Sequence, residues 1–223
     1  MILYSVTSLD DEMFIFLGGR GTRAPAASVG TPGSPTRLAS CGAYALLGEL
    51  LFQATGLPAR YWRIGKNRCG KPHAVTQHIN GHFDVSVSHS GRLIAAAVST
   101  IGPIGIDVEC RQPGRDVVGM AGLAFGESER LEVIRNGEDA FYRIWTLREA
   151  MAKALGVGYP LVVDGCDRVP LDPVNGSWGT LVDGRRWFFS HSRPDAMTHI
   201  ALACLAPSQY VSSRPNCPPS FYI

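Results

Sequence analysis

The sequence predicts an α+β fold made of two similar halves, and three observations support this prediction. Apolar residues recur every three or four positions over residues 38–55 and 139–155, which is typical of helices packed on a core. Residues 83–88 and 104–109 alternate between apolar and polar, as half-buried strands do. The triplet Ser-His-Ser occurs twice, at residues 88–90 and 190–192. Each triplet precedes an alanine-rich strand, and a pseudo-twofold duplication of an α/β-type half would explain the echo.

The other predicted elements lie around these segments. The N-terminal part adds a Gly- and Pro-rich loop and two short strands, at residues 18–37, 2–6 and 61–64. The rest of the chain adds a turn, a helix and further strands, at residues 89–91, 126–135, 93–98, 186–189 and 200–205. We therefore expect an N-terminal subdomain over residues 1–101, a C-terminal subdomain over 102–206, and a poorly ordered Pro-rich tail over 207–223.

The composition is that of a globular protein and argues against several classes of function. The chain has 223 residues, 45% of them hydrophobic and 18% charged, and its net charge of +2 does not indicate nucleic acid or a membrane surface as a partner. Its six cysteines show no C-x-x-C spacing, which argues against a zinc or thioredoxin-like site. No secretory signal and no apolar run of about 18 residues is present, so we expect a cytoplasmic monomer with reduced thiols.

Asp107 and Glu109 are the first candidates for chemistry. They are two positions apart on a predicted strand, so both side chains point to the same face. Two close carboxylates repel each other unless a cation lies between them. Hard oxygen ligands of this kind suit Mg²⁺, which completes its coordination with water and substrate phosphates. The alternative is an ordinary solvated strand face that carries two acids.

The predicted helix over residues 139–155 carries a second polar row. Trp145, Glu149 and Lys153 are four positions apart and follow one face, with Arg148 beside them. An exposed Glu–Lys pair would explain the charges alone. The large aromatic residue in the same row favours a lined cleft instead.

Two further segments can contact phosphate. Ser88 and His89 lie at the end of a strand, where functional residues gather, although Ser and Gly also favour simple turns. The basic loop over residues 65–72 nearly matches a phosphate-binding P-loop, but Pro72 replaces the hydroxyl residue that the motif needs. We therefore reject a P-loop and keep a loop that holds a phosphate or an adenine. The histidines at positions 73, 78 and 82 are interpreted as loop residues without a metal role.

Taken together, these motifs resemble those of the Sfp-type 4′-phosphopantetheinyl transferases. Residues 70–72 look like the family motif G-K-P, and residues 83–91 look like F-x-x-S-H-S. Residues 105–109 resemble G-[IV]-D-[IVL]-E, and residues 145–153 resemble W-[ST]-x-K-E-[AS]-x-x-K. The last two motifs, about forty residues apart, are the most specific, and the resemblance covers roughly residues 38–205.

The resemblance implies transfer of the phosphopantetheine arm of coenzyme A to a serine of an apo acyl or peptidyl carrier protein. Such carriers serve fatty-acid, polyketide or nonribosomal peptide synthesis. It implies that Mg²⁺ is held by Asp107, Glu109 and Glu149, and that Lys153 contacts the transferred phosphate. Coenzyme A would contact the remaining predicted binding residues, which are Lys71, Pro72, Ser88, His89 and Arg148. Glu149 or a metal-bound water would take the proton of the carrier serine.

The sequence also departs from the family pattern. Arg148 stands where the family usually has lysine, which keeps the charge but changes the shape of the group. Tyr44 stands where an arginine for the 3′-phosphate is expected, and the arginines at positions 20, 23 and 37 are possible substitutes. Two rival functions are an inactive relative that only binds coenzyme A or a carrier protein, and a metal-dependent nucleotide hydrolase.

Overall fold

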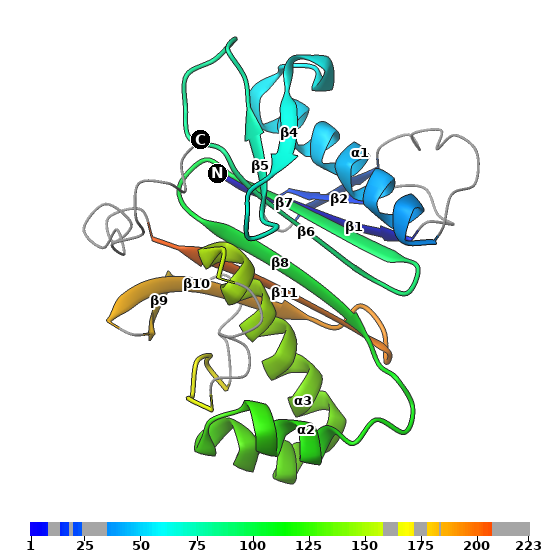
Figure 1. Ribbon diagram of the computed structural model, residues 1–223, viewed down its shortest axis with the longest axis vertical. Coiled ribbons are helices and arrows are strands. Elements are labelled where there is room, and N and C mark those ends of the chain that lie inside the picture. Colours follow the sequence, from blue (N-terminus) through cyan, green and yellow to red (C-terminus); the bar gives the residue numbers. More distant parts are fainter. Residues whose placement is uncertain are drawn as a thin grey trace.

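The computed structural model describes residues 1–8, 14–17, 20–23, 35–157, 165–171, 178–182 and 184–206. Two antiparallel sheets pack against each other between two helical layers, with α1 on one side and α2 and α3 on the other (Figure 1). The helices are α1 (Pro35–Thr55), the short η1 (Ala59–Tyr61), α2 (Val117–Ala124) and α3 (Glu127–Leu155). The strands are β1 (Ile2–Ser8), β2 (Phe14–Leu17), β3 (Arg20–Arg23), β4 (Arg63–Lys66), β5 (Pro72–Val75), β6 (Asp84–Ser90), β7 (Leu93–Ser99), β8 (Ile104–Cys110), β9 (Trp178–Val182), β10 (Arg185–Ser192) and β11 (Thr198–Leu205).

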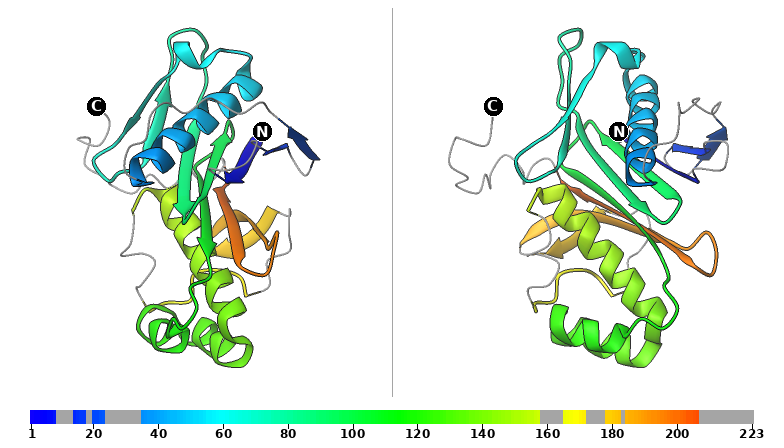
Figure 2. Two further views of the ribbon diagram at one scale, coloured as in Figure 1. Left: turned by 90° about the vertical axis from the view of Figure 1, so that its right-hand side faces the viewer. Right: turned by 45° about the vertical axis from the view of Figure 1, so that its right-hand side comes forward.

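The N-terminal sheet has seven strands in the order β3-β2-β1-β7-β6-β5-β4, and α1 packs on one of its faces. Leu46, Leu47, Leu50 and Leu51 of α1 are fully buried against β6 and β7. Their spacing places them on one side of the helix, which explains the periodicity in the sequence. The two views in Figure 2 show α1 running across this sheet.

The C-terminal sheet has four strands in the order β8-β11-β10-β9, and α3 packs on it. A Cβ on Gly105 would lie only 1.8 Å from the carbonyl oxygen of Ala150, so this glycine allows α3 to approach β8 directly. Gly137 interrupts α3 with a positive φ of 64°, a conformation that favours glycine. The sequence predicts two helices on either side of this residue, and the interruption confirms it.

A shared apolar core joins the two sheets. Strand alternation builds it, because Ala95 and Ala97 of β7 face the second sheet while their neighbours face α1. On β8, Ile104, Ile106 and Val108 point into this shared core. The residues between them point the other way, toward α3. The fold therefore places Asp107 and Glu109 on the helix side of β8.

The predicted α+β class is confirmed, but every strand pair in the described part of the chain is antiparallel, so the halves are not of α/β type. The two Ser-His-Ser triplets each end the first strand of a hairpin, β6–β7 and β10–β11. This placement is compatible with a duplication, which stays a prediction.

The turn predicted at residues 89–91 is wrong in its extent, because β6 continues through Ser90 and only Gly91, with a φ of 58°, and Arg92 form the turn. The tail over residues 207–223 lies outside the described residues. Among the helices that the structure describes, none has both the length and the apolar character needed to cross a bilayer.

Candidate active site

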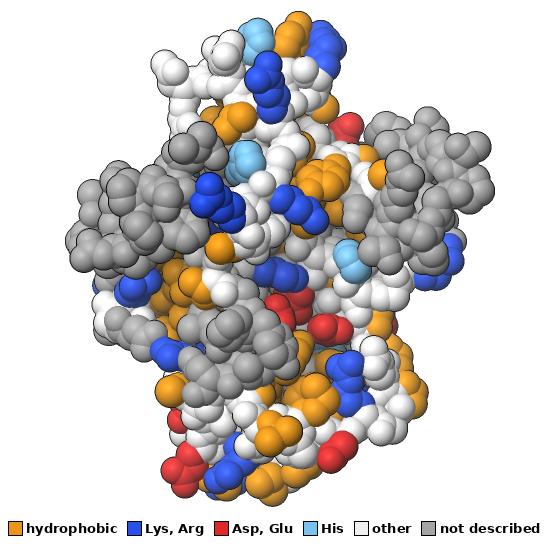
Figure 3. All heavy atoms as spheres, viewed as in Figure 1, with side chains coloured by type: hydrophobic (Ala, Val, Ile, Leu, Met, Phe, Trp, Pro, Cys, Tyr) orange, Lys and Arg blue, Asp and Glu red, His pale blue; other side chains and the backbone are white. Residues whose placement is uncertain are grey.

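A cleft of about 460 Å³ opens where the two halves meet. Basic and acidic side chains lie next to each other in the hollow at the middle of the molecule (Figure 3). The walls come from α1, the end of β4, the loop before β5, β6, β8 and the C-terminal turns of α3. The charged side chains that line the cleft are Lys66, Lys71, Lys153, Asp107, Glu109 and Glu149.

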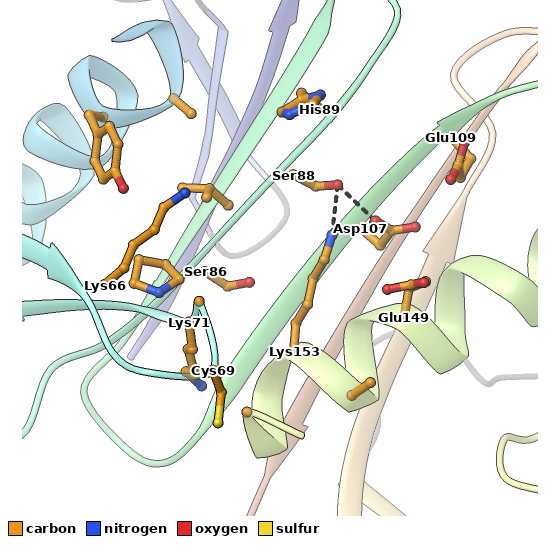
Figure 4. Close-up of a pocket in the computed structure, with 17 residues that line it drawn as sticks. Lys66, Cys69, Lys71, Ser86, Ser88, His89, Asp107, Glu109, Glu149 and Lys153 are labelled. Carbon is orange, nitrogen blue, oxygen red and sulfur yellow. Dashed lines mark hydrogen bonds and ion pairs between the residues drawn. The ribbon is translucent and has the colours of Figure 1, made fainter. Parts of the chain in front are cut away.

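Lys153 and Asp107 form the centre of the cleft (Figure 4). The Nζ of Lys153 lies 2.6 Å from Oδ1 of Asp107 and donates to Oγ of Ser88 at 2.8 Å. The Ser88 hydroxyl donates in turn to the same Asp107 oxygen at 2.7 Å. Three motifs that are far apart in the sequence therefore meet within hydrogen-bond distance, from β6, β8 and α3.

Local structure explains why these side chains converge. Asp107 and Glu109 share the helix-facing side of β8, and Glu149 and Lys153 lie one turn apart on α3. The close approach at Gly105 brings α3 over the strand, so the two acidic positions of β8 face the helix that carries Glu149 and Lys153. Figure 4 shows all four side chains in one region of the cleft.

The carboxylates destabilise one another's charge. Burial and the charge of Asp107 raise the pKa of Glu109 to about 7. Burial and the same Asp107 charge also raise the pKa of Glu149, while Lys153 opposes both shifts. A single lysine therefore does not neutralise the three acids, and a cation between them would stabilise their ionised forms.

The residues fit a divalent cation in their chemistry. Oδ2 of Asp107 is buried and has no hydrogen-bond partner, although buried polar atoms are nearly always paired. A bound Mg²⁺, which prefers oxygen ligands, would give this free oxygen a partner. It would also lower the raised pKa values of the two glutamates. Among the residues that the structure describes, no three acidic, histidine or cysteine side chains already form a metal-binding group.

The basic side of the cleft is only partly available to a ligand. Lys66 and His89 line it and are exposed, and Pro72 lies in the wall. Lys71 also lines it, but its Nζ lies 2.6 Å from Oδ2 of Asp84 and donates to the Ala154 carbonyl at 2.8 Å. The ammonium of Lys71 thus ties the N-terminal sheet to the end of α3.

The structure does not bring Arg148 to the cleft. Its side chain is fully buried on another side of α3, where Nη1 lies 2.6 Å from Oε2 of Glu129 and donates to the Cys166 carbonyl at 2.7 Å. Its guanidinium also lies over the Phe125 ring. The coenzyme A contact predicted for Arg148 is therefore replaced by a structural ion pair. Trp145 is likewise buried in the C-terminal core and does not line the cleft.

Sequence reasoning missed three residues around the site. Ser86 and Ser90 lie two positions on either side of Ser88, and Asp84 begins the same row. The signal was available in the alternation of β6, where small polar residues occupy every second position. This alternation places the small polar residues on one side of the strand, but it does not say that this side faces β8.

The fold and the site together define a class of protein. It has two packed antiparallel sheets, and the cleft between its halves combines three carboxylates with a lysine, an arrangement suited to a phosphorylated substrate and a divalent cation. Residues 103–204 match the 4′-phosphopantetheinyl transferase superfamily, and the predicted resemblance is thereby confirmed. The matched region contains Asp107, Glu109, Glu149 and Lys153 of the cleft.

Individual relatives are also named phosphopantetheinyl transferases. A 4′-phosphopantetheinyl transferase of Bacillus subtilis is 32% identical over 128 residues, which are 53% of this chain and 54% of that protein. The L-aminoadipate-semialdehyde dehydrogenase-phosphopantetheinyl transferase of Mus musculus is 26% identical over 185 residues, 73% of this chain and 59% of that protein. The transferase Sfp of Bacillus subtilis strain 168 is 28% identical over 130 residues, 53% of this chain and 54% of that protein. The chain spans little more than half the length of these relatives.

Proposed function

We propose that this protein transfers the 4′-phosphopantetheine arm of coenzyme A to a serine of an apo carrier protein, giving the holo carrier and 3′,5′-ADP. The observation that carries the proposal is the contact of Lys153 with Asp107 and Ser88 at 2.6 and 2.8 Å, beside Glu109 and Glu149. These residues come from three separate motifs of the family that the chain resembles.

The reaction can be assigned to side chains of the cleft. The carrier serine oxygen forms a bond to the phosphorus attached to pantetheine, and the bond from that phosphorus to the ADP oxygen breaks. Lys153 stabilises negative charge that builds on the phosphate oxygens. Glu149 would accept the serine proton, since its carboxylate lies in the same region of the cleft as Lys153.

Asp107, Glu109 and Glu149 would hold Mg²⁺, which would supply positive charge for the pyrophosphate. For coenzyme A, we assign contacts to the exposed Lys66 and His89 and to Pro72 at the wall. Lys71 and Ser88 already have protein partners, so their role is to shape the cleft. The two sheets are taken as two subdomains, with the boundary between Ser99 and Ile104.

Intact-protein mass spectrometry tests the proposal. Several apo carrier proteins are incubated with the protein, coenzyme A and Mg²⁺, with EDTA in a parallel reaction. We expect a gain of one phosphopantetheine on at least one carrier, and EDTA should prevent it. The Asp107→Ala and Glu149→Ala variants should give no gain.

The remaining outcomes separate the rivals. Coenzyme A binding by calorimetry without transfer to any carrier would indicate an inactive relative. Turnover of nucleotides or ADP-ribose without a carrier would indicate a hydrolase. Full transfer in EDTA, or by the Asp107→Ala variant, would refute the metal assignment.

A further inference from the structure

A row of side chains on β6 replaces the backbone ladder that would normally cover the edge of β8. Four alternate amides of β8 donate to four alternate side chains of β6. The pairs are Ile104 N to Asp84 Oδ2 at 2.7 Å, Ile106 N to Ser86 Oγ at 3.1 Å, Val108 N to Ser88 Oγ at 3.4 Å and Cys110 N to Ser90 Oγ at 3.0 Å. We call this row the serine seam.

The seam meets a need of the fold. β8 is an edge strand of its sheet, and β11 pairs with it on one side only. The amides of alternate residues therefore point away from β11, and burying them without acceptors would be costly. Serine is short enough for the two strands to approach, and its oxygen accepts the amide hydrogen. The seam thus fixes the position of β8 relative to the N-terminal sheet.

The seam also reaches the acidic residues of the site. A serine oxygen that accepts an amide still has its own hydrogen to donate. Ser88 donates to Oδ1 of Asp107 at 2.7 Å, and Ser90 donates to Oε2 of Glu109 at 3.1 Å. Each of these two serines thus joins a β8 amide to the carboxylate of the preceding residue.

Ser88 has no capacity left for a ligand. Its oxygen accepts from Val108 and Lys153, and its hydrogen goes to Asp107. A hydroxyl has one hydrogen and two lone pairs, so all three are used. Ser90 does not line the cleft, unlike Glu109, so any effect of Ser90 on a ligand must pass through that carboxylate.

We propose that Ser90, with Ser88, is a positioning residue that holds the carboxylates of Asp107 and Glu109 in the geometry for a divalent cation. This inference rests on the proposed function. It assigns the serines of the Ser-His-Ser motif to the orientation of acidic ligands, while contact with phosphate is left to His89.

The test compares Ser90→Ala with Ser86→Ala. Each variant loses one acceptor of a β8 amide, at 3.0 Å for Ser90 and 3.1 Å for Ser86. Of these two serines, only Ser90 also donates to a carboxylate among the described residues. Binding of Mn²⁺ to the full chain without coenzyme A is followed by the electron paramagnetic resonance signal of the free ion. Because a hydrogen bond that orients a metal ligand typically contributes about 10-fold in affinity or more, Ser90→Ala should weaken Mn²⁺ binding about 10-fold.

Ser86→Ala should bind Mn²⁺ within about twofold of the wild type, and Ser90→Thr, which keeps a hydroxyl, should recover most of the affinity. Urea unfolding of both alanine variants checks that they fold and lose similar stability. In the transfer assay, Ser90→Ala should lower kcat and leave KM for coenzyme A unchanged.

Each other result overturns the proposal. Equal Mn²⁺ affinity in Ser90→Ala and the wild type, equal weakening in both alanine variants, or no Mn²⁺ binding by the wild type would each do so. A rise in KM for coenzyme A alone would indicate that Ser90 contributes to coenzyme A binding and does not position Glu109. If the wild type modifies no carrier protein, the proposed function fails, but the Mn²⁺ measurements still decide the role of Ser90.

Discussion

Arg148 and Lys153 lie five positions apart on helix α3, and each pairs with a carboxylate. The two pairs differ in almost every physical respect. Lys153 pairs with Asp107 across the cleft, and its side chain is 28% exposed. Arg148 pairs with Glu129 inside the C-terminal half, and both side chains are fully buried. The sequence presents both cations in one motif, so residue type and spacing do not distinguish the two pairs.

The two pairs differ in whether the oxygens of the carboxylate all have partners within the protein. The carboxylate of Glu129 also accepts the amides of Arg168 and Val169, so its buried oxygens are used within the protein. Asp107 keeps one buried oxygen without a partner, and Lys153 has part of its surface open to the cleft. A saturated pair supports the fold, whereas a pair with free capacity can bind something else.

Of the two cations, Lys153 should have the larger effect on activity. We expect Lys153→Ala to lower the transfer rate by about 10²- to 10³-fold, because a group that stabilises charge in the transition state is lost. The unfolding free energy should fall by only about 1–3 kcal/mol, since Asp107 keeps the Ser88 hydrogen bond. Rates come from the mass assay, and stability comes from urea unfolding.

A matched control is Arg143→Ala, which removes another α3 cation that lies 2.7 Å from a carboxylate, Glu132, outside the cleft. It should transfer at nearly the wild-type rate. If Lys153→Ala and Arg143→Ala transfer equally well, Lys153 does not act on the phosphate.

Replacing Arg148 should have the largest effect on stability. Arg148→Ala leaves Glu129 buried without its cation, and we expect a loss of roughly 3–5 kcal/mol in unfolding free energy. Arg148→Lys should restore part of it, because lysine keeps the charge but not the planar donor geometry. Urea unfolding measures both variants. A normal stability combined with a raised KM for coenzyme A would instead place Arg148 at the cleft.

These two pairs also show how much of the site can be predicted from the sequence. The positions of Asp107, Glu109, Glu149 and Lys153 follow from strand and helix periods, and the structure places all four in one cleft. Spacing along a helix does not say what lies opposite each face. Along α3, the row that begins at Trp145 is buried in the core and reaches the cleft only at Glu149 and Lys153.

The contacts between the halves could not be predicted from the sequence for a different reason. The seam depends on β6 and β8 meeting edge to face, with a register that tertiary packing sets. Ser90 was assigned to a turn because Ser and Gly both favour turns. In the structure only Gly91 and Arg92 form it, and Ser90 is paired with Leu93 as part of the hairpin.

Lys71 offers a third pair, which joins the two halves. Its ammonium contacts Asp84 and the end of α3, and its side chain is 12% exposed. We expect Lys71→Met to lower the unfolding free energy by about 1–3 kcal/mol, because Asp84 loses a largely buried partner. A double-mutant cycle with Asp84→Asn should give a coupling energy of about 1–2 kcal/mol. A large rise in KM for coenzyme A without a stability change would show that Lys71 contacts the ligand instead.

The smallest expected effect is a change of the unfolding free energy with pH, caused by Glu109 in the cleft. Burial and Asp107 raise the pKa of Glu109 to about 7, above its ordinary value of 4.5. The folded chain therefore holds a proton that the unfolded chain releases between these values, and the Glu109 contribution to stability is lost as pH rises through about 7. Burial first, and then nearby positive charge, lower the pKa values of His191 and His199 to about 4 and about 3. The contribution of these histidines is present above their ordinary pKa of 6.5 and is lost as pH falls, so their slope is opposite.

Between about pH 6.5 and pH 8 the unfolded chain still releases protons from these two histidines, so their opposite slope offsets that of Glu109. The contribution of Glu109 is therefore measured as the difference between the wild type and Glu109→Gln. In EDTA, urea unfolding should show that the wild type loses on the order of 1 kcal/mol relative to Glu109→Gln across this range, after allowance for solvent screening. Glu109→Gln cannot titrate at this position, so its unfolding free energy should rise over this range as the histidines of the unfolded chain lose their protons. A saturating divalent cation should also remove the Glu109 contribution from the wild-type profile, because it stabilises the ionised carboxylates. Parallel profiles for the variant and the wild type would mean that Glu109 does not titrate over this pH range.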